Sequence, residues 1–296
     1  MTSILGLDGV LLQEINSRKK THAIKWHLFC LLQTMNRKYL LFGLVIILCS
    51  FSKYASHSFH SADFNIENIK PFTIGEKLVY KIAYGIIEVG NANLEVKSIA
   101  SSPECFRVVA KGYTNFAFDW IFKVRDHYES IIDSSSMKPK FFIRNVSEGN
   151  VKFNQFYTFN HNKRIVNTGE QNIKVPDNVQ DMVSCYFYAR TLNLKNLKKD
   201  TVLSFNSIVD GEIYNLKVKY IGKEHIKIEA GQFNALKFCP IVQKGRIFKE
   251  EEDLTVWISN DYNKIPLLVK AKIWVGSVRM ELEKMDGELN TPNLLE

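Results

Sequence analysis

The side chains best suited to chemistry in this 296-residue chain are histidines and carboxylates, and their spacing argues against a catalytic centre. After residue 52, His57 and His60 are the one closely spaced histidine pair, and they lie in a polar stretch typical of a solvated linker. A zinc site needs three or four ligands at suitable spacing, so this pair predicts no metal site.

Two groups of carboxylates could also form a catalytic or cation-binding site. Asp126, Glu129 and Asp133 resemble a cluster, but side chains alternate along a strand, which places Asp126 on the face opposite the other two. Paired acid–base catalysis is therefore not predicted from them. The acidic run 250–253 could attract a cation, but four successive carboxylates beside Lys249 are more typical of a charged, solvated turn.

The common catalytic and phosphate-binding motifs are absent from the sequence. It has no G-x-S-x-G, no G-x-x-x-x-G-K-[ST] and no G-x-G-x-x-G. We therefore predict a protein that is not an enzyme and that uses no cofactor. A hydrolase acting on polysaccharide or lipid stays as an alternative, which a buried carboxylate pair or a Ser–His pair would support.

The cysteines do not form a disulfide framework. Cys30 and Cys49 precede the candidate domain, and Cys105, Cys185 and Cys239 lie far apart with no CxxC spacing. Three cysteines permit at most one internal bridge. We interpret them as small buried hydrophobic residues.

The stretch 35–56 has the layout of a secretory signal peptide. A charged start at 36–38 precedes an apolar run at 39–48 and then small and polar residues. The run has about a dozen residues, whereas a membrane-spanning helix needs about 20. We expect an exported protein that starts at Met35, with 1–34 as an upstream extension and 57–71 as a flexible linker. Leu48 stands where a lipobox needs a small residue, so lipid anchoring at Cys49 is not expected.

The charge distribution disfavours nucleic acid as a partner. The net charge is +8, but the residues after position 52 carry 33 basic and 29 acidic side chains with both signs interspersed. No polybasic stripe stands out.

Most of the chain after residue 71 alternates between apolar and polar residues at strand length. The candidate strands are 76–82, 89–96, 105–112, 122–132, 141–146, 151–159, 164–167, 202–209, 213–221, 225–228, 233–241, 254–258, 266–273 and 277–285. Asp210-Gly211 between two such runs is a strong hairpin signal. Helical crossovers between the strands are missing, so the sheet should be antiparallel.

One segment has helical periodicity. Its apolar residues recur at steps of three and four, and we predict a helix over 179–192 whose start is marked by Asp177 and Gln180 as a capping box. The apolar face comprises Val179, Met182, Val183, Tyr186, Ala189 and Leu192. Asp181, Ser184 and Arg190 lie off this face, and we interpret them as structural anchors between the helix and the sheet.

Four aromatic residues alternate along one stretch that leads into the fourth candidate strand. Phe116, Phe118, Trp120 and Phe122 would share one face if the chain were extended there. Ordinary core packing explains this pattern. Alternatively, the rings line a cavity or face a membrane surface.

Together these elements predict a mainly β, single domain over 72–286, followed by a polar tail at 287–296. Open twisted sheets rarely exceed about ten strands without curling. We therefore expect a large curved antiparallel sheet that forms a half-open β-barrel, with the helix covering its open side.

Several short motifs resemble those of the envelope-protein family known as domain of unknown function 3108. They are Gly75-Glu76-Lys77-Leu78, Val89-Gly90-Asn91-Ala92, Arg125-Asp126-His127-Tyr128-Glu129-Ser130 with Asp133 and Pro139, Gln180-Asp181-Met182-Val183-Ser184 with Arg190, Ala230-Gly231-Gln232-Phe233-Asn234-Ala235, and Trp257-Ile258-Ser259-Asn260-Asp261 before Pro266. The resemblance implies a curved, open β-barrel similar to the Lol lipoprotein carriers. It also implies a location in the periplasm, or on the periplasmic face of the outer membrane, of a Gram-negative bacterium. It carries no known catalytic residues.

Our leading hypothesis is an envelope protein that binds an apolar ligand, such as a lipid or lipoprotein acyl chain, between sheet and helix. The candidate wall consists of Phe116, Phe118, Trp120, Phe122, Met182, Val183 and Tyr186. The alternative is an interaction module with a filled core that docks an envelope protein through its strand edges. Peripheral contact with a membrane is compatible with both.

Overall fold

A computed structural model describes residues 71–242, 248–250, 252–274 and 276–287, all within one compact unit. These residues form 14 strands and two short helices. The elements are β1 (Lys77–Tyr84), β2 (Ile87–Ser98), β3 (Cys105–Thr114), α3 (Phe116–Asp119), β4 (Arg125–Asp133), β5 (Pro139–Glu148), β6 (Val151–Asn160), β7 (Ile165–Asn167), β8 (Asn172–Lys174), α4 (Ser184–Arg190), β9 (Val202–Val209), β10 (Glu212–Ile228), β11 (Gly231–Pro240), β12 (Leu254–Ser259), β13 (Pro266–Lys272) and β14 (Ser277–Asp286). The predicted mainly β fold is confirmed.

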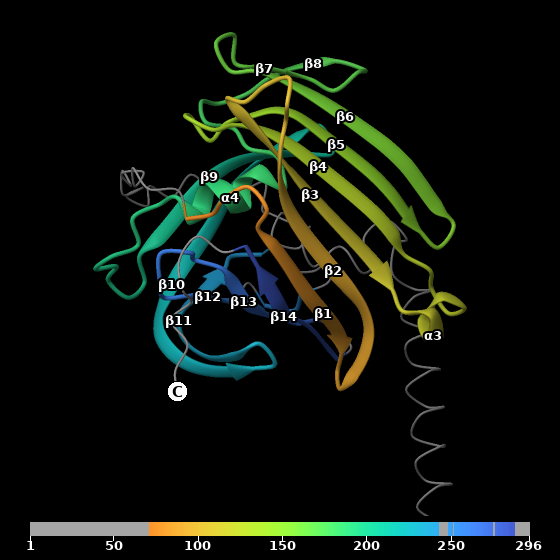
Figure 1. The fold of residues 1–296 in the computed structure, drawn as a ribbon, viewed down its shortest axis with the longest axis vertical. Coiled ribbons are helices and arrows are strands. Elements are labelled where there is room, and N and C mark those ends of the chain that lie inside the picture. Colours follow the sequence, from red (N-terminus) through yellow and green to blue (C-terminus); the bar gives the residue numbers. More distant parts are fainter. Residues whose placement is uncertain (1–70, 243–247, 251, 275, 288–296) are drawn as a thin grey trace, which may run out of the picture. The chain divides into compact units, whose positions relative to one another are not determined.

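All the strands belong to one antiparallel sheet that is not closed (Figure 1). Its order is β8-β7-β6-β5-β4-β3-β2-β1-β14-β13-β12-β11-β10-β9. Each half of the chain is thus a simple meander, and the first and last strands join the two meanders in the middle of the sheet. All hydrogen-bonded strand pairs of the sheet are consecutive in the chain except β1 with β14, in which Lys77 lies opposite Asp286 and Tyr84 opposite Val278. The connection from β8 to β9, which contains α4, runs between the two edges of the sheet.

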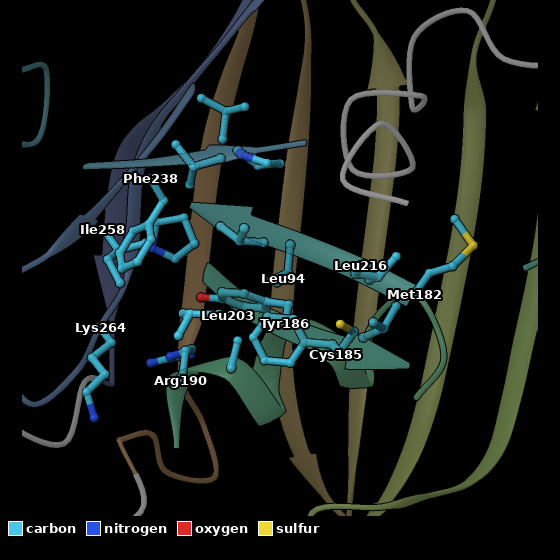
Figure 2. Close-up of a pocket in the computed structure, with 18 of the residues that line it drawn as sticks. Leu94, Met182, Cys185, Tyr186, Arg190, Leu203, Leu216, Phe238, Ile258 and Lys264 are labelled. Carbon is cyan, nitrogen blue, oxygen red and sulfur yellow. The ribbon is translucent and has the colours of Figure 1, made fainter. Parts of the chain in front are cut away.

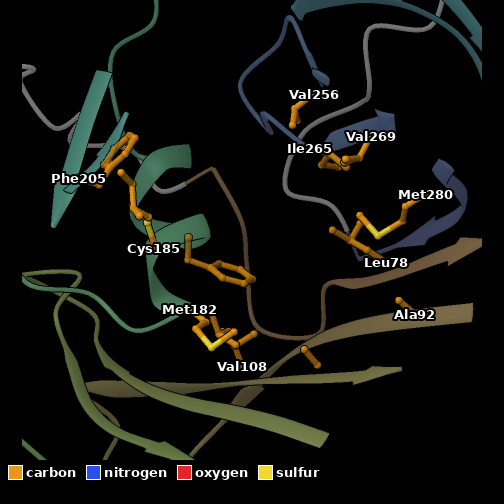
Figure 3. Close-up of a cluster of buried hydrophobic side chains, with 14 of the residues drawn as sticks. Leu78, Ala92, Val108, Met182, Cys185, Phe205, Val256, Ile265, Val269 and Met280 are labelled. Carbon is orange, nitrogen blue, oxygen red and sulfur yellow. The ribbon is translucent and has the colours of Figure 1, made fainter. Parts of the chain in front are cut away.

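Helix α4 packs on the inner face of the curved sheet. Phe187 is fully buried, and its ring lies 4.9 Å from that of Phe72 and 6.3 Å from that of Phe106 in β3. On the other side of the helix, the Tyr188 ring lies 6.2 Å from that of Phe205 in β9. One continuous hydrophobic core therefore contains α4 and both meanders; Figure 3 shows part of it.

The predicted helix over 179–192 is longer than the observed one, which begins at Ser184 and ends at Arg190. Gln180, inside the predicted range, is not helical because it pairs with edge strand β9, and Met182 and Val183 form a turn before the helix. The Gln180 amide donates to the Asn206 carbonyl, and the Gln180 carbonyl accepts from the Ile208 amide. Asp177 does not cap the helix, since its carboxylate accepts from the Asn178 amide and from Lys138.

The prediction that residues 116–122 are extended and present four aromatic rings on one face is wrong. Phe116–Asp119 forms the single-turn helix α3, with further turn residues after it. A polar network holds this turn: Thr114 Oγ1 donates to Asp119 Oδ1 at 2.6 Å, and the Arg125 guanidinium pairs with both oxygens of the same carboxylate. Strand alternation therefore does not apply to these rings.

Several predictions fall outside the described residues. These are the upstream extension 1–34, the signal peptide 35–56, almost all of the linker 57–71, the two histidines at 57 and 60, and nearly all of the tail 287–296. Within the described residues, no helix combines the length and the apolar character that crossing a membrane would require.

Candidate functional site

The candidate site is an apolar cavity of about 170 Å³ between α4 and the inner face of the sheet (Figure 2). Nine consecutive strands of the sheet, from β3 through β1 and β14 to β9, each contribute one or two side chains. The lining residues are Tyr80, Leu94, Ala110, Met182, Val183, Cys185, Tyr186, Ala189, Arg190, Leu194, Leu203, Phe205, Leu216, Val218, Phe238, Pro240, Val256, Ile258, Lys264, Pro266, Val269 and Met280.

Period-2 alternation explains why the strands present these side chains together. Leu203 with Phe205, and Leu216 with Val218, are spaced two residues apart and therefore lie on one face of their strands. Neighbouring antiparallel strands keep this phase because directly opposite residues share a face, as Val218 and Leu203 do. The cavity is thus the part of the inner face that α4 does not fill.

Asp181 fixes the start of α4 against β4. Its Oδ1 accepts from the backbone amides of Val183 and Ser184 at 2.7 and 2.8 Å, and its Oδ2 accepts from Ser130 Oγ at 2.6 Å. Burial raises the pKa of this carboxyl from its ordinary 3.8 to about 6, because the hydrogen bonds only partly offset the loss of water. A buried, titratable group therefore sets where the helix begins.

A buried ion pair fixes the other end of α4. The Arg190 guanidinium donates to both carboxylate oxygens of Glu76, at 2.6 and 2.8 Å, and also to the carbonyls of Pro71 and Asn263. The guanidinium carbon of Arg190 also lies 5.2 Å from the centre of the Phe72 ring, where a cation–π interaction stabilises the charge. Arg190 thus joins the helix to the chain before β1 and to the turn between β12 and β13.

The polar groups of the cavity wall are few. Burial raises the pKa of both the Tyr80 and the Tyr186 hydroxyl above the ordinary value, so both phenols are neutral. The Arg190 charge is neutralised by Glu76. An occupant of this cavity therefore meets mainly aliphatic and aromatic carbon.

The structure divides the predicted wall into two groups. Met182, Val183 and Tyr186 line the cavity. The four aromatic residues at 116–122 do not: Phe116 is 93% exposed and Trp120 is 71% exposed. Phe118 is half-buried, and the ring of the half-buried Phe122 lies over Gly149 in the β5–β6 turn.

The predicted anchors Asp181, Ser184 and Arg190 are all buried and all make the contacts described above. The strand residues missed by sequence reasoning are the inward-facing side chains of β1–β3 and β9–β14. The sequence shows the alternation of apolar and polar residues along these strands. It does not show which face of each strand points inward, because that depends on the curvature of the sheet.

The other candidate chemical groups are dispersed. Asp126 is buried beside the buried Glu148 and accepts from the Ser147 amide, but neither carboxylate lines the apolar cavity. Glu129 lies half-buried beside His127 on the other face of β4. Cys105, Cys185 and Cys239 are free thiols and buried. In the described part of the chain, no three His, Cys, Asp or Glu side chains converge as metal ligands.

The geometry therefore defines a class: an open, half-barrel antiparallel sheet with one helix over an apolar cavity. Within that class, the chain belongs to the family described as "Protein of unknown function (DUF3108)", whose model matches residues 79–283. A comparison with curated proteins finds no match.

Solved structures with a similar fold share little sequence with the chain. A beta-barrel-like protein of domain of unknown function DUF1849 from Brucella abortus is 9% identical with a TM-score of 0.50, and the match covers 73% of this chain and 98% of that one. A hypothetical protein from Chlamydia trachomatis is 9% identical with a TM-score of 0.34, over 76% and 93% of the two chains. The first likeness agrees with the barrel-like fold and says nothing about function.

Proposed function

We propose that this protein is a non-enzymatic, exported envelope protein that binds an acyl chain, of a lipid or a lipoprotein, in the cavity beneath α4. The observation that carries the proposal is the apolar lining of a cavity that nine strands and a helix surround. The signal-peptide pattern at 35–56 supports export.

The cavity volume limits the size of the buried group. An apolar cavity of about 150 Å³ stays dry and holds benzene. The cavity of about 170 Å³ is of that size, so it accommodates a few carbons of a chain rather than a whole lipid. The remainder of a longer chain would extend toward solvent or displace α4.

The alternative, docking of a protein through strand edges, has less support. Edge strand β8 has only three residues, Asn172–Lys174. The other edge, β9, already pairs with the backbone of Gln180. Both features reduce the backbone available for another strand.

Filling the cavity tests the proposal. Ala189 lies on α4 and lines the cavity, so we expect Ala189→Phe to abolish enhancement of 1-aminoanthracene fluorescence, which the unaltered protein should show. Lipid extracted from the purified protein and identified by mass spectrometry gives an independent readout.

Ala117→Leu is the matched control because Ala117 is exposed on α3 and outside the cavity lining. It should bind the fluorophore like the unaltered protein. Absence of both fluorophore binding and copurified lipid in the unaltered protein would refute the proposed function.

A further inference from the structure

A second cavity, of about 330 Å³, adjoins the apolar one; its lining mixes polar and apolar side chains, and it is called the polar cavity below. Leu194 and Lys264 line both cavities. The other residues of the polar cavity are Lys195, Asn196, Leu197, Tyr220, Lys223, Leu236, Asn260, Asp261 and Tyr262. An apolar compartment and a polar one therefore share a wall just beyond the C-terminal end of α4.

The polar cavity has an excess of positive charge. Three lysines line it, Lys195, Lys223 and Lys264, against the single carboxylate of Asp261. That carboxylate is already engaged, since its Oδ1 accepts from Ser259 Oγ and from the amides of Asn263 and Lys264. The electrostatic balance of this cavity favours an anion.

A β-bulge turns Lys223 toward this site. The register of β10 against β11 shifts between Tyr220 and Gly222, so that Tyr220 lies opposite Phe238 and Lys223 lies opposite Leu236. Phe238 and Leu236 are two residues apart and share a face of β11. Without the bulge, the odd-numbered Lys223 would lie on the outer face of β10.

The second lysine is held at the rim by an aromatic ring. Lys195 follows α4 and its Nζ lies 5.2 Å from the centre of the Tyr262 ring. Both side chains line the polar cavity. The lysine is exposed, so its ammonium group can be reached from solvent.

We propose that the ligand is an anionic single-chain amphiphile, with its carboxylate or phosphate headgroup among Lys195, Lys223 and Lys264 and the start of its chain in the apolar cavity. This inference rests on the proposed function and adds the charge and position of the headgroup. Leu194 and Lys264 line both cavities, so a headgroup in the polar cavity lies next to the start of an acyl chain in the apolar one.

Competition against 1-aminoanthracene, an uncharged fluorophore, tests the proposal. Dodecanoate, dodecyl phosphate and dodecanol each have twelve carbons in one saturated chain and differ in the headgroup. At a pH where the acids are ionised, at least one anion should displace the fluorophore at about tenfold lower concentration than the alcohol, the effect of one charge-assisted contact. The better of the two anions identifies the headgroup, and high salt should reduce its advantage.

The double variant Lys195→Gln/Lys223→Gln should remove this advantage and leave displacement by dodecanol unchanged. Lys198→Gln/Lys199→Gln is the matched control, because both lysines are exposed on the same connection but line neither cavity. Retention of the advantage in the first variant, or equal displacement by alcohol and anions, would overturn the inference while leaving acyl-chain binding intact. Failure of the fluorophore to bind the unaltered protein, together with absence of copurified lipid, would instead refute the proposed function.

Discussion

At the scale of single residues, Glu76 and Arg190 form an ion pair that is buried on both sides. Both side chains are almost completely buried, so each charge depends on the other for compensation. We expect Arg190→Met to lower the free energy of unfolding by about 3–5 kcal/mol, because it leaves a buried carboxylate without its partner. Chemical denaturation with urea measures this loss.

Two further variants separate charge from packing at the same place. Arg190→Lys should recover little, since an ammonium cannot reproduce the two-point contact with Glu76. Glu76→Gln in the Arg190→Met background should recover part of the loss. Lys284→Met, at an exposed pair with Asp286, should change stability by less than about 0.5 kcal/mol. Equal effects of Arg190→Met and Lys284→Met would contradict the role of the buried pair.

The Asp181 carboxyl makes stability depend on pH. Its pKa of about 6 in the folded protein exceeds the ordinary 3.8, so the folded state binds the proton more tightly than the unfolded state. The contribution of Asp181 to stability is therefore full below about pH 4 and is lost as the pH rises through 6, by about 3 kcal/mol in total.

Asp181→Asn tests this dependence. The amide oxygen can still accept from the amides of Val183 and Ser184, but the side chain no longer titrates. The stability of the variant relative to the unaltered protein should rise between pH 4 and pH 7. Asp126, whose pKa is also raised by burial, is present in both proteins and cancels. A constant difference across this range would disprove the assignment.

At the scale of elements, the two errors of sequence reasoning arise because hydrogen bonds overrule an apolar pattern. The periodicity at 179–192 identified a helix, but Gln180 instead satisfies its backbone groups by pairing with β9. The alternation at 116–122 suggested a strand, but the contacts of Asp119 with Thr114 and Arg125 fold the chain into a turn. The backbone partners of Gln180 lie in β9, far along the chain, whereas those of Asp119 lie only five and six residues away, but the periodicity of apolar residues reports neither set of hydrogen bonds. Strands bounded by turn signals, such as Asp210-Gly211, were predictable because their information is local.

The burial of the aromatic residues in these two helices predicts mutational effects of very different size. Phe187→Ala on α4 should cost about 3–5 kcal/mol of unfolding free energy, because the ring is fully buried against Phe72. Phe116→Ala on α3 should cost less than about 0.5 kcal/mol, since its side chain is 93% exposed. Thermal and urea unfolding compare the two. A large loss for Phe116→Ala would revive the view that it belongs to an internal wall.

At the scale of the whole sheet, the sequence predicted antiparallel strands but not the way its open side is restrained. The turn between β9 and β10 reaches side chains of β5 and β6, which lie in the other meander. Asp210 Oδ1 accepts from Arg144 Nη1 at 2.8 Å and from Gln155 Nε2 at 3.1 Å, and the Gly211 amide donates to the Tyr157 hydroxyl. These hydrogen bonds connect the two meanders across the open side of the sheet, where the strands are not paired with one another.

Asp210→Asn tests this connection without disturbing the turn, since Asn tolerates the positive φ of 51° at this position as well as Asp does. The Arg144 side chain is 1% exposed, and its charge would lose the carboxylate that faces it. We expect a loss of about 1–3 kcal/mol in unfolding free energy, because one oxygen can still accept a hydrogen bond. Amide hydrogen exchange should become faster in β5, β6 and the β9–β10 hairpin, and should stay unchanged in β1 and β14, whose ladder joins the meanders independently. Faster exchange throughout the sheet would show that this contact stabilises the whole fold and not the open side in particular.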